Sequence, residues 1–193
     1  MSKPTNITGI ILAGGEGRRM GGEDKGWLEV EGLPLIKRAI RRLEPQVSEI
    51  IISANRNLDA YQTLGKRFFH DTTPYLGPLG GIAACLRQIN TEYALVVPTD
   101  APLISLNLVD LLKQQIPSKL ILCEDNQRLQ PLFGLYHYSL ADSIEHYLAA
   151  GERKLTLWCE QQQPARVTIG DTSAFTNLNT PADLNEFEKN LHT

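Results

Sequence analysis

With 193 residues, the chain is long enough for one well-cored domain and too short for two ordinary ones, so we expect a single domain over residues 1–193. Its hydrophobic content of 42% and charged content of 21% are typical of a soluble globular protein. The net charge of −3 argues against a general surface for nucleic acid or membrane, and neither a membrane span nor a signal peptide is predicted. Three widely spaced cysteines indicate neither a disulfide framework nor a zinc site, so we expect a cytoplasmic protein.

A glycine-rich stretch follows the first predicted strand, a short apolar run at residues 7–12 that is typical of a buried parallel strand. Five glycines lie between residues 14 and 22, beside the cations Arg18, Arg19 and Lys25. Backbone N–H groups can approach an anion closely where side chains are missing. The stretch therefore predicts a loop that binds a polyphosphate, because a merely flexible loop would not explain the cations.

Two common phosphate-binding loops are excluded by the residues present. A P-loop requires Gly-Lys-Ser/Thr, whereas Asp24 precedes Lys25 and Gly26 follows it. The dinucleotide-binding fingerprint requires a third glycine where Met20 stands. We therefore expect a polyphosphate loop of another kind.

Polar residues follow the second predicted strand. A helix that begins near Pro34, with an apolar stripe reaching Leu43, leads to this strand at residues 49–53. Ser53 and Asn55 lie at its carboxyl end, where open α/β sheets bind ligands, which makes them candidates for hydrogen bonds to a nucleotide base. A turn that needs asparagine for its backbone is an equally good interpretation.

An acidic residue follows the most clearly apolar predicted strand. A short helix at residues 60–64, a strand at 67–70 and a second glycine-rich loop at 75–81 precede it. The strand at 93–97 then runs directly into Asp100, which is flanked by prolines. A carboxylate beside a polyphosphate would be repelled unless a divalent cation lay between them, and Mg²⁺ is typically held by one or two carboxylates plus phosphates. We favour metal ligation by Asp100 over a role in capping a turn.

The elements after Asp100 are predicted as follows. A helix over residues 105–116 would have Ser105 as its cap and Leu106, Val109, Leu112 and Ile116 facing inward. Strands are expected at residues 120–123, 130–136, 165–169 and 175–179, and helices at 141–150, near Trp158 and from Thr180. In a strand at 175–179, Asn177 and Asn179 would share one face, from which they could contact phosphate or a metal.

Strands and helices alternate through residue 116, which predicts a parallel α/β sheet with right-handed connections and a site at the carboxyl ends of its strands. The residues after Leu120 look irregular, and we expect them to complete the site from the other side. The chain would then divide into a nucleotide-binding half, residues 1–116, and an acceptor-side half, residues 117–193.

The glycine-rich stretch resembles the signature of a known family. Residues 12–25, Leu-Ala-Gly-Gly-x-Gly-x-Arg-Met-Gly-Gly-x-Asp-Lys, are similar to the signature of the molybdenum cofactor guanylyltransferases, the MobA family of nucleotidyltransferases. Further matches lie at residues 53–56, 71, 77–81, 98–102, 151–153 and 177–181. Ser53 stands where some members have asparagine, and Thr99 where cysteine is frequent. The resemblance implies a three-layer, Rossmann-like nucleotidyltransferase (GT-A-like) α/β fold with a mostly parallel central sheet.

The resemblance also implies roles for individual residues. The nucleotide would be held by Leu12, Ala13, Gly14 and Gly15 and contacted by Lys25 and Asp71. Asp100 would hold Mg²⁺ and Asn179 would share it, while Ser53 and Asn55 stay candidates for the base. Arg19, Lys25 and Asp100 would be the catalytic residues.

The implied reaction is guanylyl transfer. A phosphomonoester of molybdopterin would attack the α-phosphate of GTP and release pyrophosphate, while Arg19, Lys25 and Mg²⁺ neutralise charge. The implied partners are these two substrates and, transiently, proteins of cofactor biosynthesis or molybdoenzyme maturation. Alternatives are cytidylyl transfer to the same cofactor, nucleotidyl transfer to a sugar phosphate, and a nucleotide-binding module without catalysis.

Overall fold

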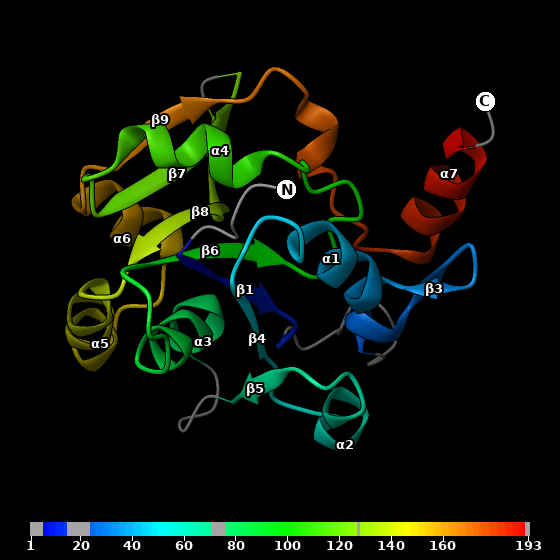
Figure 1. The fold of residues 1–193 in the computed structure, drawn as a ribbon, viewed down its shortest axis with the longest axis horizontal. Helices are drawn as coiled ribbons and strands as arrows, with labels where there is room; N and C mark the ends of the chain where they lie inside the picture. Colours follow the sequence, from blue (N-terminus) through cyan, green and yellow to red (C-terminus); the bar gives the residue numbers. More distant parts are fainter. Residues whose placement is uncertain (1–5, 15–23, 71–75, 127, 192–193) are drawn as a thin grey trace.

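The computed structural model describes residues 6–14, 24–70, 76–126 and 128–191. Its centre is a seven-stranded sheet with the strand order β5-β4-β1-β6-β8-β7-β9 (Figure 1). The strands are β1 (Ile7–Leu12), β4 (Glu49–Ser53), β5 (Arg67–Phe69), β6 (Tyr93–Pro98), β7 (Leu120–Asp125), β8 (Arg128–His137) and β9 (Ala165–Thr168). β5, β4, β1 and β6 pair in parallel, β8 pairs antiparallel with β6 and β7, and β9 pairs in parallel with β7. The predicted mostly parallel sheet is confirmed.

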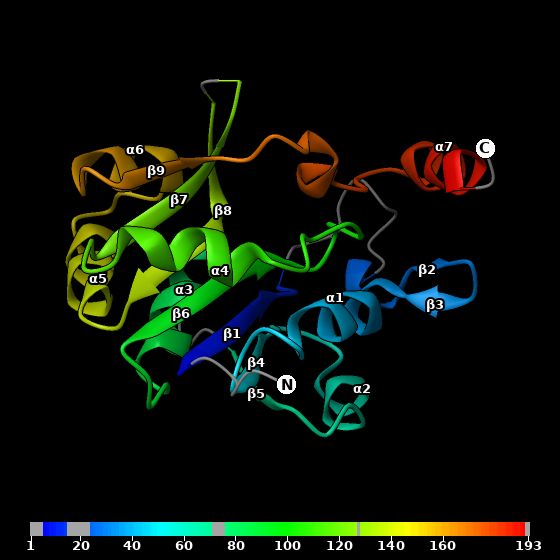
Figure 2. The same ribbon diagram turned by 45° about the horizontal axis from the view of Figure 1, so that its top comes forward.

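Helices cover both faces of the sheet, because its central strands are apolar on both sides. One buried cluster joins Ile11 to α1 (Leu35–Leu43), α2 (Leu58–Gln62) and α4 (Leu108–Leu112). A second cluster joins Ile10 to α3 (Gly77–Leu86), α5 (Leu140–Ala149) and α6 (Leu155–Gln161) (Figures 1 and 2). Neighbouring side chains of a strand point to opposite faces, so these two isoleucines mark the two sides of the sheet. The three-layer α/β fold is therefore confirmed.

A third, smaller cluster lies beside the main sheet. β2 (Glu29–Val30) and β3 (Leu33–Pro34) form an antiparallel hairpin, and α7 (Pro181–Leu191) stands next to it (Figure 1). The buried members of the cluster are Val30, Leu35, Leu178 and Phe187. The hairpin therefore provides an apolar surface on which α7 packs.

The predicted helix at residues 105–116 is shorter than expected. α4 begins only at Leu108, because the Ser105 hydroxyl donates to Oδ1 of Asn107 and caps no helix N–H. After α4 the chain tightens into a short 3-10 helix, η3 (Lys113–Gln115). Leu106 and Ile116, expected inside, lie outside α4 and are 59% and 42% exposed, so their inward placement was wrong. Val109 and Leu112, which lie within α4, are buried as predicted.

The predicted strand at residues 175–179 is absent, and a 3-10 helix, η4 (Thr172–Phe175), occupies its beginning. The Asp171 side chain starts this helix by accepting from the N–H of Ser173 at 3.0 Å. Phe175 is buried in the cluster with α1 and α4, and Leu178 in the third cluster, although neither residue belongs to a strand. The shared face expected for Asn177 and Asn179 therefore does not follow from strand geometry.

The residues after Leu120 are more regular than the sequence suggested, because β7, β8 and β9 extend the same sheet. The expected pairing of residues 120–123 with 130–136 is confirmed by the antiparallel β7–β8 ladder. None of the described helices combines the length and apolar character that a bilayer-spanning helix needs.

Candidate active site

The site begins where three neighbouring strands end. In the register of the sheet, Leu12 of β1 lies opposite Ser53 of β4 and Pro98 of β6. Two further backbone bonds continue this alignment: Ala13 N donates to the Ser53 carbonyl at 2.7 Å, and Thr99 N donates to the Leu12 carbonyl at 3.1 Å. The chain turns to opposite sides of β1 to reach β4 and β6, so their carboxyl ends flank a topological switch point, where open α/β sheets bind ligands.

At the carboxyl ends of these strands, one lysine contacts both an aspartate and an asparagine. We call these three residues, Lys25, Asp100 and Asn179, the charged trio. Nζ of Lys25 donates to Oδ2 of Asp100 at 3.1 Å and to Oδ1 of Asn179 at 2.7 Å. The side chains of the lysine and the aspartate are 20% and 16% exposed, so the ion pair is partly shielded from water. The sequence predicted all three residues as site residues, and the structure brings them together.

The segment before α7 holds Asn179 against Asp100. The N–H of Leu178 donates to the Asp100 carbonyl at 2.9 Å. Oδ2 of Asp183 accepts from the N–H groups of Asn179 and Thr180 at 2.8 and 2.9 Å, and the Thr180 hydroxyl accepts from the N–H of Asp183 at 3.2 Å. These reciprocal bonds form a capping box at the start of α7, where the sequence predicted that a helix begins. They lower the pKa of the Asp183 carboxyl, the bond from Asn179 N–H most of all.

A buried carboxylate, Asp24, lies just before Lys25 in the chain and is only 6% exposed. Its Oδ1 accepts from Gly26 N at 3.1 Å and from the Tyr61 hydroxyl at 2.8 Å, and its Oδ2 accepts from Nδ2 of Asn57 at 3.1 Å. Burial and the nearby carboxylate raise the pKa of Tyr61 well above its ordinary value, so this hydroxyl stays protonated and donates. The sequence analysis missed these supports of Lys25. The one signal was the acid beside the lysine in the motif, because nothing local points to Asn57 or Tyr61.

Ser53 and Asn55 lie beside the beginning of the glycine-rich stretch. Ser53 is 3% exposed and contributes its carbonyl to Ala13, as described above. Nδ2 of Asn55 lies 3.3 Å from the position that a Cβ on Gly14 would occupy. A Cβ at residue 14 would thus require a small shift of the Asn55 side chain, while contact of Ser53 or Asn55 with a base stays a prediction. Gly15, Arg19 and Asp71 lie outside the described residues.

The amino-acid sequence matches the model of a protein family over residues 9–166, and that family is described as the MobA-like NTP transferase domain. The chain belongs to this family. A molybdenum cofactor guanylyltransferase of Shewanella putrefaciens is 41% identical to this MobA-like chain, over 95% of the chain and 97% of its own length. One of Serratia proteamaculans is 46% identical, over 92% and 91%.

Solved structures have the same fold as this MobA-like protein. The molybdopterin-guanine dinucleotide biosynthesis protein A of Archaeoglobus fulgidus superposes with a TM-score of 0.79 at 22% identity, covering 96% of this chain and 99% of its own. The 2-C-methyl-D-erythritol 4-phosphate cytidylyltransferase of Thermus thermophilus superposes with a TM-score of 0.72 at 15% identity, covering 97% and 99%. These likenesses establish the nucleotidyltransferase type of fold.

The oxygens of the charged trio in this MobA-like protein fit a divalent metal ion. Oδ2 of Asp100 and Oδ1 of Asn179 converge on a single cation, the ammonium of Lys25, which serves here as a stand-in. Carboxylate and amide oxygens are ligands that Mg²⁺ accepts, and it usually takes others from phosphates and water. Within residues 6–14, 24–70, 76–126 and 128–191, no three His, Cys, Asp or Glu side chains gather around a possible metal position. A metal at the trio would therefore take its remaining ligands from other sources, such as phosphate or water.

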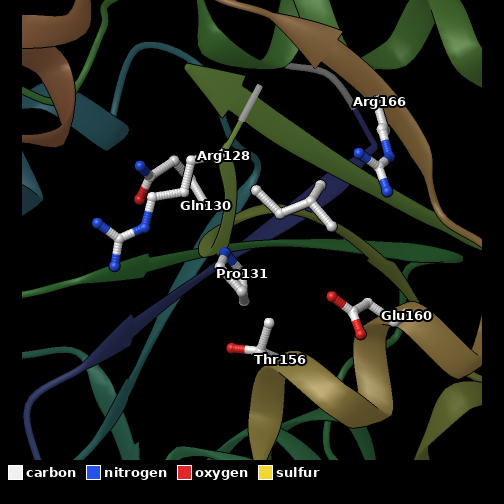
Figure 3. A pocket seen from close by; sticks show the side chains of 7 residues that line it. Arg128, Gln130, Pro131, Thr156, Glu160 and Arg166 are labelled. Atoms are coloured by element: carbon white, nitrogen blue, oxygen red, sulfur yellow. The ribbon is translucent and has the colours of Figure 1, made fainter. Parts of the chain in front are cut away.

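A separate cavity of about 360 Å³ lies between the start of β8, α6 and β9. Its lining includes Arg128 and Gln130 on one side and Glu160 and Arg166 on the other (Figure 3). β8 runs antiparallel to β6, so the residues before Gly134 extend toward the end of the sheet where β6 leads into Asp100. None of the lining residues was predicted from the sequence to be a site residue.

Proposed function

We propose that this protein is a molybdenum cofactor guanylyltransferase, which transfers GMP from GTP to the terminal phosphate of molybdopterin. The observation that carries the proposal is the charged trio at the strand edge: a lysine for a triphosphate and two oxygens for a cation. The choice of GTP and molybdopterin is supported by the names of relatives that are 41% and 46% identical over more than nine-tenths of the chain.

The chemistry is displacement at phosphorus. An oxygen of the molybdopterin phosphomonoester forms a bond to the α-phosphorus of GTP, and the bond from that phosphorus to the oxygen bridging to the β-phosphate breaks, so its electron pair leaves with pyrophosphate. A phosphomonoester has a second pKa of about 6 and is already largely ionised near neutral pH. No general base is needed. The protein's task is to orient both phosphates and neutralise their charge.

We assign Mg²⁺ as the metal ion, held by Asp100 and Asn179, where it would neutralise charge on the nucleotide phosphates. Lys25 cannot keep its bonds to both oxygens while a metal occupies the same space. In this proposal the ammonium therefore turns from the two oxygens to the triphosphate when the nucleotide binds. Gly15, Arg19 and Asp71 are proposed as further nucleotide contacts on the basis of the family signature.

We further propose that residues 1–116 bind the nucleotide and that residues 117–193 provide the acceptor side, apart from the contribution of Asn179 to the metal. The cavity in Figure 3 supports this division, because all of its lining residues belong to the second half and it lies toward the same edge of the sheet as Asp100.

The function is tested by replacing Asp100. Asp100→Ala is expected to lower Mg²⁺-dependent guanylyl transfer by about a hundredfold or more, because a charge-stabilising group is lost. Its circular dichroism spectrum should match the wild type, since the side chain lies at the edge of the sheet. Asp110→Ala, at an exposed acid of α4, is the matched control and should keep full activity. Full activity of Asp100→Ala would refute the assignment.

The substrate is tested by measuring pyrophosphate release with molybdopterin and each of the four nucleoside triphosphates. We expect release with GTP. Release only with CTP would favour a cytidylyltransferase, and release only with a sugar phosphate as acceptor would favour a sugar-phosphate nucleotidyltransferase. Tight binding of nucleotide with no release under any condition would favour a binding module.

A further inference from the structure

The connection from β4 into α2 lies beside both described ends of the glycine-rich stretch. Asn55 approaches Gly14 so closely that a Cβ there would lie 3.3 Å from its amide nitrogen. Asn57 donates to Asp24 at 3.1 Å. Gly14 and Asp24 are thus each approached by one of two asparagines that are only two positions apart in the chain.

Asp24 accepts three hydrogen bonds, and their donors are residues outside the charged trio. Three donors reach its two oxygens. They are the backbone N–H of Gly26 in η2 (Lys25–Trp27), the amide of Asn57 just before α2, and the hydroxyl of Tyr61 within α2. A carboxylate that is 6% exposed needs such partners, because burying it without them is costly. The geometry therefore fixes the carboxylate, and with it the backbone that leads into Lys25.

The packing around Gly26 leaves little freedom for this arrangement. A Cβ on Gly26 would lie 2.4 Å from the Tyr61 hydroxyl oxygen, so the hydroxyl sits directly over the backbone of η2. The Tyr61 ring is fully buried and contacts the Trp27 ring with centroids 5.4 Å apart. Tyr61 therefore cannot move away from Asp24 without disturbing the residues that follow Lys25.

We propose that Asp24 is a positioning residue, which Asn57 and Tyr61 hold in place so that the Lys25 ammonium reaches its partners in the active site. The proposal rests on the proposed function for its consequence in nucleotide binding. In this proposal the polar residues after β4 also support Lys25, through Asn57, in addition to the base contact expected for Ser53 and Asn55. Asp24 acts only through Lys25 and touches no substrate.

The first test exchanges the acceptor and the donor of the Asp24–Asn57 hydrogen bond. In Asp24→Asn, one of the two acceptor oxygens becomes an amide donor, so the side chain can no longer accept from Gly26, Tyr61 and Asn57 together. We expect the Kd for Mg–GTP, measured by calorimetry without acceptor, to rise about tenfold. In the double variant Asp24→Asn with Asn57→Asp, the amide at position 24 donates to the carboxylate at position 57, and most of the affinity should return. Asp tolerates the left-handed backbone at residue 57, where φ is 51°. Failure of the exchange to recover affinity in a protein of normal thermal stability would overturn the proposal.

The second test asks whether the effect passes through Lys25. In a Lys25→Met background, Asp24→Asn should change the Kd for Mg–GTP by less than about twofold, because coupled residues are not additive. An equal loss in both backgrounds would mean that Asp24 has only a general structural role, and the proposal would be wrong.

A readout without nucleotide separates this inference from the proposed function. Lys25 is shielded by its two bonds, so its acetylation by acetic anhydride, followed by mass spectrometry, should be several times faster in Asp24→Asn than in the wild type. The exposed Lys37 of α1 is the internal reference. Wild-type protein that binds no Mg–GTP would contradict the proposed function alone, whereas an unchanged labelling rate of Lys25 would contradict the positioning role.

Discussion

Replacing Lys25 with methionine is expected to tighten the binding of a divalent metal ion to the protein when no nucleotide is present. The ammonium now lies between Oδ2 of Asp100 at 3.1 Å and Oδ1 of Asn179 at 2.7 Å. A metal ion must displace it to reach both oxygens. Methionine keeps an unbranched stem and removes the charge, so the competitor is lost with little change in packing.

The ion pair sets the size of this effect. Two unit charges 3.1 Å apart attract by about 5 kcal/mol at the effective dielectric constant of about 20 that applies near a protein surface. The two side chains are 20% and 16% exposed, so desolvation and the ordering of the lysine reduce the net gain to about 1–2 kcal/mol. Since a factor of ten corresponds to about 1.4 kcal/mol, the Kd for the metal ion should fall by about 5- to 30-fold.

The assay uses Mn²⁺ in place of Mg²⁺, because electron paramagnetic resonance measures free Mn²⁺ directly during a titration with protein. Lys37→Met makes the same change in net charge at an exposed position of α1 and should leave the Kd for Mn²⁺ unchanged. With GTP present, Lys25→Met should instead raise the Kd for Mn²⁺, because the variant removes a cation from the triphosphate. An unchanged or higher Kd for Mn²⁺ in Lys25→Met without nucleotide would refute the competition.

Two further predictions concern the framework of the site. Gly134→Ala places a Cβ 2.4 Å from the Ile121 carbonyl oxygen in the β7–β8 ladder, so it should lower the free energy of unfolding by about 1–3 kcal/mol in urea titrations. Gly170→Ala, which meets nothing within 4 Å, is its control, and equal stability of the two variants would contradict the reasoning. The Asp183 carboxyl has a pKa below its ordinary value of 3.8, so its capping bonds stabilise the fold above that pH and are lost as the pH falls through the lowered pKa. The amide resonances of Asn179 and Thr180 should therefore titrate with a midpoint below pH 3.8, and a midpoint at or above that value would count against the cap.

The sheet could be predicted because its strands are continuous apolar runs with clear ends. Residues 93–97, for example, are apolar throughout and became the centre of β6. The prediction of a strand failed where side chains are buried although their backbone pairs with no other strand. Phe175 and Leu178 are buried in different clusters outside the sheet, and a local rule cannot distinguish such burial from a strand.

Candidate site residues could be named from the sequence, but their arrangement in space could not. Lys25 and Asp100 were both recognised, but their contact joins positions 75 residues apart, and the contact of Lys25 with Asn179 joins positions 154 apart. The buried hydroxyl of Tyr61 needs a partner, which is a general signal for such a side chain, yet only the fold reveals that the partner is Asp24.

The third cluster has a consequence for the order in which the protein is made. Val30 and Leu35 are synthesised early, but Leu178 and Phe187, which pack on them and hold Asn179 in place, are among the last described residues. A nascent chain can thus form the strands of the sheet while still lacking the Asn179 amide that the proposed metal site requires. Polypeptides that terminate before residue 178 should be catalytically silent, so ribosomal stalling or early termination would waste no nucleotide in futile turnover.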